Sequence, residues 1–291
     1  MTAASLVPLL FVGIWATGFI VARLVTPHAD PLFFLVCRFV LSALAFAGIA
    51  AVARARWPQG LRGWRDALVA GVLMQGLYLG GVFWSVRHGL PAGISALIAG
   101  LQPLLTALLA PSLLGERVGG RRWAGIALGF AGALLVLEPQ LRTASMGLSG
   151  GTPILPLLAS GGAMVALTLG TIWQKRTASD VDLRTNAAVQ FIGAALVTAP
   201  VAALTESGRF DGSWQVWAGL AWAVCGLSLG AISLLLLLIR RGVVAGVASL
   251  FYLVPPVVAV LAFVLFGERL SALQIAGMAV AALGVAVASR T

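Results

Sequence analysis

Few side chains in this 291-residue chain could do chemistry, because only 10% of its residues are charged. Its two histidines, His28 and His88, and its two cysteines, Cys37 and Cys225, do not combine with carboxylates at the spacing of metal ligands. No phosphate-binding loop of the P-loop type is present either. The pattern therefore favours a protein that is not an enzyme, needs no cofactor and binds no metal.

Arg38 is the one charge that falls well inside an apolar stretch. It stands about seven residues, or roughly 10 Å at 1.5 Å per helical residue, from the start of that stretch. An arginine at this depth either anchors the carboxylate of a substrate or has a structural role, bonding backbone carbonyls or extending to the membrane surface. The residues alone leave both roles open.

Other polar and aromatic side chains stand near the middle of apolar stretches and could bind a small solute. An amino acid needs hydrogen bonds for its charged groups and an apolar wall for its side chain, which amides and the rings of Trp and Tyr can supply. The predicted substrate-binding residues are Trp15, Arg38, Gln75, Tyr78, Gln102, Ser228 and Tyr252.

The nine carboxylates map to connectors or to the ends of apolar stretches. Ionisable groups within a membrane are costly and functional by default, and a proton-coupled exchanger generally needs a carboxylate there. We therefore expect facilitated diffusion or substrate exchange. The alternative is proton coupling through His88, because a histidine can change its charge near neutral pH.

Membrane-spanning helices are the elements that must position these residues. The chain is 60% hydrophobic with a mean hydropathy of +1.02, and a bilayer core of about 30 Å needs roughly 20 helical residues. Helices satisfy their own backbone within lipid. The sequence predicts an all-α membrane protein with ten transmembrane helices and no soluble domain, at residues 5–24, 31–53, 64–86, 91–112, 121–138, 152–174, 185–205, 214–239, 244–266 and 271–289.

The basic residues set the expected orientation and partners. Most of the 19 Lys and Arg residues lie on the even-numbered connectors and at the C-terminus, which the positive-inside rule assigns to the cytoplasm. Both termini are therefore predicted to be cytoplasmic. The basic residues do not gather on one face, so the net charge of +10 does not indicate nucleic-acid binding. The expected partners are the lipid bilayer and a small-molecule substrate; the oligomeric state is left open, and a monomer is compatible with the sequence.

An internal repeat relates the two ends of the chain. LLGER at 113–117 nearly recurs as LFGER at 265–269, and GLPAGISALIAGLQP at 89–103 aligns with GVVAGVASLFYLVPP at 242–256. The match continues as far as Gly132 and Gly284. It predicts two five-helix halves, residues 1–145 and 146–291, and because five is odd the halves have opposite topology.

The Gly-Glu steps of the repeat are expected to be structural. Gly115 and Gly267 should end the preceding helix, where a left-handed residue is common. Glu116 and Glu268 should then favour the positive N-terminal end of the helix that follows.

Inverted halves predict alternating access to a site near the middle of the membrane. Pro103, Pro255 and Pro256 interrupt the fourth helix of each half at matching positions. Because proline kinks a helix and frees a carbonyl, these residues are predicted to form a hinge or gate.

The repeat, together with GIWATGFIVARLV at 13–25, Pro31 and Arg38, resembles the EamA family of the drug/metabolite transporter superfamily over nearly the full length. The resemblance implies the ten-helix transporter fold, a bacterial inner membrane, and a cavity surrounded by the first, third, fourth, sixth, eighth and ninth helices. Within the superfamily, the sequence is most similar to bacterial aromatic amino-acid exporters. The resemblance also implies an arginine at this position in transporters of varied cargo, which favours the structural role of Arg38.

The expected function is therefore export of small metabolites by alternating access, with amino acids, aromatic ones included, as the leading cargo. Efflux of drugs or nucleoside-like metabolites is the alternative within transport. An intramembrane enzyme or a receptor-like binding protein is the alternative outside it.

Overall fold

The computed structural model describes residues 3–102, 104–106, 108–109, 119–145, 154–177, 181–231, 234, 254–268 and 270–289. These residues are almost entirely helical and contain one isolated β-bridge, between Ala29 and Phe210. The N-terminal part forms α1 (Ala3–Val25), α2 (Pro31–Val52), α3 (Gly60–Gly71), η1 (Val72–Leu77), α4 (Tyr78–Arg87), α5 (Ala92–Gly100) and α7 (Gly120–Ser145). The C-terminal part forms α8 (Ile154–Thr177), α9 (Leu183–Thr205), α10 (Trp214–Trp222), η2 (Ala223–Ala231), α13 (Val254–Phe266) and α14 (Ala272–Ser289).

The helices follow the apolar stretches of the sequence. Four of them, at Pro31–Val52, Gly60–Arg87, Ile154–Thr177 and Leu183–Thr205, are long and apolar enough to cross a membrane. The second of these runs through α3, η1 and α4 as one helix with a π-helical turn in the middle. Shorter apolar helices overlap five of the other six predicted spans, all except 214–239. The all-helical class is confirmed, whereas the count of ten crossings stays a prediction.

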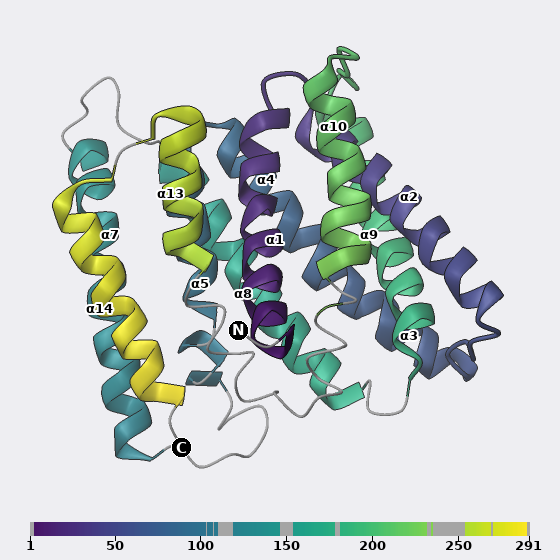
Figure 1. Cartoon of the computed structure of the whole chain (residues 1–291), viewed down its shortest axis with the longest axis horizontal. Coiled ribbons are helices and arrows are strands. Elements are labelled where there is room, and N and C mark those ends of the chain that lie inside the picture. The colour runs from purple at the N-terminus through teal and green to yellow at the C-terminus, as the bar shows by residue number, and fades with distance from the viewer. Residues whose placement is uncertain are drawn as a thin grey trace.

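The helices α7 and α14 lie side by side at one end of the molecule, and α2 and α9 pack together at the other (Figure 1). Glycine permits the first of these contacts. A Cβ atom on Gly132 would overlap the backbone of Ala281, and a Cβ atom on Gly284 would overlap the backbone of Gly129. The two helices therefore touch main chain to main chain, as small residues allow within membranes.

A carboxylate joins α2 and α9 at one end. Oε1 of Glu206, directly after α9, accepts a hydrogen bond from the backbone N–H of Leu32 at 2.9 Å, and Oε2 accepts one from Phe33 at 2.8 Å. These N–H groups lie in the first turn of α2, where backbone N–H groups have no acceptor within their own helix. Glu206 therefore caps α2 from a neighbouring helix, and its charge suits the positive end of the helix dipole.

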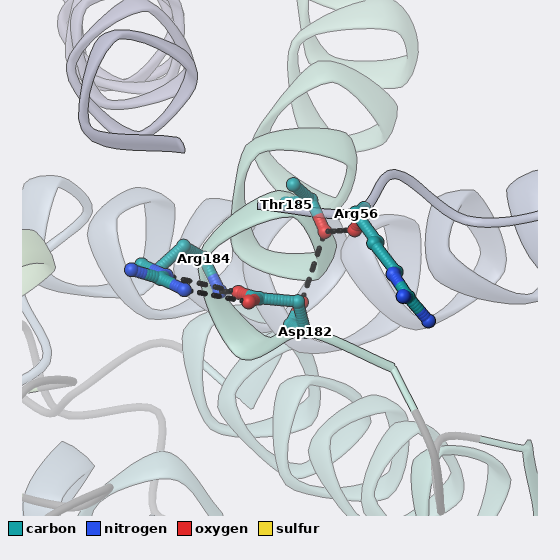
Figure 2. Close-up of polar contacts among 4 residues, drawn as sticks. All are labelled: Arg56, Asp182, Arg184 and Thr185. Atoms are coloured by element: carbon teal, nitrogen blue, oxygen red, sulfur yellow. Dashed lines mark hydrogen bonds and ion pairs between the residues drawn. The ribbon is translucent and has the colours of Figure 1, made fainter. Parts of the chain in front are cut away.

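A second set of polar contacts joins the opposite ends of the same two helices (Figure 2). The Thr185 hydroxyl on α9 lies 2.9 Å from the backbone oxygen of Arg56, just beyond α2, and 3.0 Å from that of Asp182. Asp182 accepts two hydrogen bonds from the Arg184 guanidinium, at 3.0 and 2.7 Å, and one from the Arg184 backbone N–H. The side-chain hydrogen bond from Arg184 lowers the pKa of Asp182. The helices α2 and α9 are thus antiparallel and fastened at both ends.

The connector between α1 and α2 is also held against the connector between α9 and α10. His28 Nδ1 lies 2.8 Å from Asp211 Oδ2, and Asp30 accepts hydrogen bonds from the Ser207 hydroxyl at 3.0 Å and the Arg209 backbone N–H at 2.8 Å. These contacts lie at the same end of the molecule as Glu206. We call the contacts of Glu206, Asp30 and Asp211 the connector clasp.

Stability should depend on pH through the connector clasp. Hydrogen bonds from Ser213, with a further contribution from His28, lower the pKa of Asp211 to about 2. A lowered carboxyl pKa stabilises the folded state above the ordinary value of Asp, and this contribution is lost as the pH falls towards 2. We expect the melting temperature in detergent to fall over this acid range, and less steeply in Asp211→Asn. Identical acid profiles for the two proteins would contradict this role.

Glu268 differs from its sequence-based prediction, and Gly267 agrees with it. Gly267 follows the last residue of α13 with a φ of +69°, as expected of a left-handed helix end. Glu268, however, does not cap α14. It accepts from the Ala92 backbone N–H at the start of α5 at 3.1 Å and from Arg23 at 3.3 Å.

The residues Ser271 and Gln274 cap α14 instead. The Gln274 backbone N–H donates to the Ser271 hydroxyl at 3.2 Å, and the Ser271 backbone N–H donates to the Gln274 side chain at 2.9 Å. This reciprocal pair is a capping box, which leaves Glu268 free to join α1, α5 and α13. Gly115 and Glu116 lie outside the described residues.

Candidate substrate cavity

A cavity of about 180 Å³ lies between the helices of the two ends of the chain. One water molecule needs only about 10–15 Å³ by this kind of measure, so the cavity has room for a small solute. Its described walls come from α1, α2, η1, α4, α8, α9 and η2. A second hollow of about 270 Å³, between α4, α8 and α9, is lined mainly by glycine and apolar side chains. Polar groups converge in the first cavity, which makes it the candidate site.

Five of the seven predicted substrate-binding residues line this cavity together. They are Trp15 from α1, Arg38 from α2, Gln75 from η1, Tyr78 from α4 and Ser228 from η2. The fold therefore brings side chains more than 200 positions apart in the sequence to one space. Their binding of a substrate stays a prediction.

The π-helical segments η1 and η2 each carry one of these polar residues. A π-helix adds one residue to a turn, and such turns recur at functional sites. In η2 the Ser228 hydroxyl donates to the carbonyl of Ala223, five positions earlier, at 3.0 Å. The residues Gly226–Gly230 spell the G-x-S-x-G pattern of hydrolases, but the pattern lies within a helix and not at the strand-to-helix turn that a nucleophile elbow requires.

Gln102, Tyr252 and the prolines lie elsewhere. Gln102 donates to the Thr171 hydroxyl on α8 at 3.3 Å and is not among the described residues that line the cavity. Tyr252 and Pro103 fall outside the described residues, so their predicted roles stay predictions. Pro255 lies at the start of α13, where its ring faces Gly100 of α5, and Pro256 is exposed beside it.

Three polar residues of the cavity, Gln174 on α8 and Asn186 and Gln190 on α9, were missed by the sequence prediction. Asn186 and Gln190 on α9 are only 4% and 7% exposed, and both line the cavity. They stand four positions apart, which puts them on one face of a helix, and this spacing in an apolar stretch could have revealed them. The cavity thus also takes walls from the second and seventh predicted helices, which the resemblance did not include.

The site can hold a solute by hydrogen bonds and one positive charge. Neutral amides and hydroxyls face rings and aliphatic side chains, and the described lining contains no carboxylate and no histidine. His88 lies at the end of α4, stacked on Trp84, and is not part of this lining. The arrangement suits binding and release of a polar solute with an apolar body.

The comparison with protein families agrees with this arrangement. The model of the EamA-like transporter family matches residues 2–138 and 155–290. The chain belongs to the EamA-like transporter family. Members of this family are transporters and not enzymes.

Individual relatives are also named as transporters or efflux pumps, and they align with different shares of this chain. A protein of Escherichia coli K12 named probable amino-acid metabolite efflux pump is 32% identical over 133 residues, which cover 46% of this chain and 42% of that protein. Its Salmonella typhimurium counterpart is 31% identical, and the match spans 45% of its length. An uncharacterised transporter of Synechocystis is 27% identical over 91% of this chain and 83% of its own. A crystal structure of 21% identity has the same fold, with a TM-score of 0.67 over 98% of this chain and 96% of that one.

Proposed function

We propose that this transporter exports amino acids, aromatic ones among them, by alternating access of two inverted halves, residues 1–145 and 146–291. The observation that carries the proposal is the cavity itself. Amides and hydroxyls converge there beside the rings of Trp15, Phe19 and Phe191, which together fit a charged backbone and an aromatic side chain. The name of the Escherichia coli relative, which matches less than half of this chain, supports amino acids as the class of cargo.

Matched contacts support the inverted repeat. The fifth predicted helices of the two halves, α7 and α14, pack on one another, as do the fourth (α5 and α13) and the second (α2 and α9). The first helix of each half packs on the third of the other: α1 contacts η2 and α10, and α8 contacts η1 and α4. Gly132 and Gly284, which the sequence repeat aligns, make reciprocal close approaches to the opposite helix. Contacts of this kind are expected from a two-fold axis between the halves.

Matched irregularities support alternating access. The π-helical segments η1 and η2 both fall in the third predicted helix of a half, and both line the cavity. Non-standard backbone at corresponding positions of two inverted halves is a mark of the binding site in secondary transporters.

The two ends of the cavity differ in a way that fits one state of the cycle. Its lining extends to Gln174 and Leu183, next to the connector between α8 and α9. At the other end, the connector clasp and the Glu268 contacts join neighbouring elements. By the positive-inside rule the first end is cytoplasmic, so this conformation corresponds to a cavity directed towards the cytoplasm. A bacterial inner membrane with both termini cytoplasmic completes the proposal, and a reporter fused at Thr291 that is active only outside would contradict it.

Counterflow in proteoliposomes tests the function directly. Vesicles loaded with unlabelled phenylalanine should accumulate labelled phenylalanine transiently and saturably, without a proton gradient, because the carrier exchanges substrate across the membrane. Protein-free vesicles are the control. Competition by nucleosides or by cationic dyes alone, without competition by amino acids, would instead support efflux of drugs or nucleoside-like metabolites. Absence of saturable uptake for every solute would overturn the proposal.

A further inference from the structure

The geometry points to Arg38 as the residue that recognises a substrate carboxylate, so that the transporter selects solutes that combine a carboxylate with an apolar body. This inference rests on the proposed function, because it assigns a substrate class to the same cavity. It resolves the two roles that the sequence leaves open for this arginine.

Arg38 is buried but not neutralised. Its side chain lines the cavity, and the residue is 5% exposed. Within the described ranges, no aspartate or glutamate forms an ion pair with its guanidinium. An unpaired buried charge is costly, and a charge kept inside a membrane protein commonly marks a substrate pathway.

One nitrogen of the guanidinium is occupied, and the other two remain available. Nε donates to the Ser228 hydroxyl at 3.4 Å. The terminal nitrogens make no hydrogen bond to another described residue, and they are not among the fully buried unpaired side-chain atoms of the described part of the chain. These nitrogens therefore retain accessible surface on the cavity that Arg38 lines, where they can donate two parallel hydrogen bonds to a carboxylate.

The π-helical segment η2 orients this donor. Because the Ser228 hydroxyl donates its proton to the Ala223 carbonyl, its oxygen is left to accept from Arg38 Nε. Ser228 belongs to the second half and Arg38 to the first, so a carboxylate bound here lies where the halves meet. Ser228 is a positioning residue, whereas Arg38 would touch the substrate.

The rest of the cavity lining explains why the ammonium group of a substrate should contribute less to binding than its carboxylate does. The polar side chains opposite are uncharged, among them Gln75, Asn186 and Gln190, and the described lining has no carboxylate to pair with a cation. Amide oxygens can accept from an ammonium group, but they add no opposite charge. A solute with only a carboxylate should therefore bind well, and a solute with only an ammonium group should bind poorly.

Three matched solutes test the inference on purified protein and in counterflow of labelled phenylalanine. They are phenylalanine, 3-phenylpropionate, which lacks the ammonium group, and phenethylamine, which lacks the carboxylate. We expect 3-phenylpropionate to bind and compete about 10- to 100-fold better than phenethylamine, as a charge-assisted hydrogen-bond pair would give. Arg38→Gln should abolish this ratio, and Arg38→Lys should restore part of it. Ser228→Ala should reduce it less, because the charge remains.

Arg65→Gln is the matched control, because Arg65 lies on the exposed surface beside Asp66. Melting temperatures identify any variant that fails to fold, and the ratio is read only from folded variants, where a structural arginine would leave it unchanged. If Arg38→Gln does not fold, the preference for 3-phenylpropionate over phenethylamine is measured in Arg38→Lys and Ser228→Ala. A preference unchanged in these two variants would overturn the inference. Equal binding of the carboxylate and the amine by the unaltered protein would overturn it as well, while saturable phenylalanine counterflow would leave the proposed function standing. Absence of counterflow with a retained carboxylate preference would overturn amino-acid export and support the role of Arg38.

Discussion

Replacing Gly71 by leucine is expected to unfold or misassemble the transporter. Gly71 ends α3, and a Cβ atom there would overlap the backbone of Gln190 on α9. On the same pair of helices, a Cβ atom on Gly193 would lie 2.6 Å from the backbone oxygen of Leu68. The helices touch through their main chains, so a side chain can be accommodated only if α3 and α9 separate.

Gly71→Leu is expected to lower the free energy of unfolding by at least about 3 kcal/mol, the upper range for overpacking. The backbone of α9 cannot move aside as a flexible side chain can. The yield of monodisperse protein and its melting temperature in detergent measure this effect. Gly71→Ala should lie between the leucine variant and the unaltered protein. Gly48→Leu is the control, since a Cβ atom on Gly48 meets nothing within 4 Å. Equal melting temperatures for the Gly71 and Gly48 variants would show that the close contact is not required.

Replacing Glu206 by alanine is expected to loosen the junction of α2 with α9. The substitution removes the acceptor for the N–H groups of both Leu32 and Phe33, which lie in the first turn of α2. Loss of a helix cap and of hydrogen bonds to a charged group costs about 2 kcal/mol, or a melting temperature lower by several degrees. The substitution also weakens the connector clasp.

Glu206→Gln separates the contribution of charge from that of hydrogen bonding. Glutamine keeps one acceptor oxygen but loses the negative charge at the helix end, so its melting temperature should lie between those of Glu206→Ala and the unaltered protein. Glu138→Ala on the exposed face of α7 is the control. A melting temperature of Glu206→Ala equal to that of this control would contradict the capping role.

The positions of the helices could be predicted because each depends on a local property of the chain. A run of apolar residues with the required length forms a helix in lipid regardless of its neighbours, and each predicted range overlaps a helix that the structure describes. The same holds for Gly267, whose left-handed conformation follows from the residue type. Five cavity residues were found because polar or aromatic groups near the middle of an apolar stretch are conspicuous.

The remaining features depend on contacts between distant segments. Glu268 was expected to lie by the positive N-terminal end of the helix that follows it, but only the packed structure brings the start of α5 within reach. Gln102 and Gln190 look alike in sequence, yet one pairs with Thr171 and the other faces the cavity. The direction in which a helix presents each side chain is set by its neighbours. The π-helical turns likewise leave no mark in composition.

The fastening of α2 to α9 has an energetic consequence for a transporter built from inverted halves. The first turn of α2 is capped by a carboxylate from α9, whereas α9 is capped by its own Asp182, and it receives from the end of α2 only a backbone carbonyl. If the halves exchange conformations as proposed, each of the two junctions between α2 and α9 takes the position of the other. The groups that form each junction stay different. The two junctions then contribute different free energies to the two states of the cycle, which favours an empty carrier with its cavity on one side of the membrane until a solute offsets the difference.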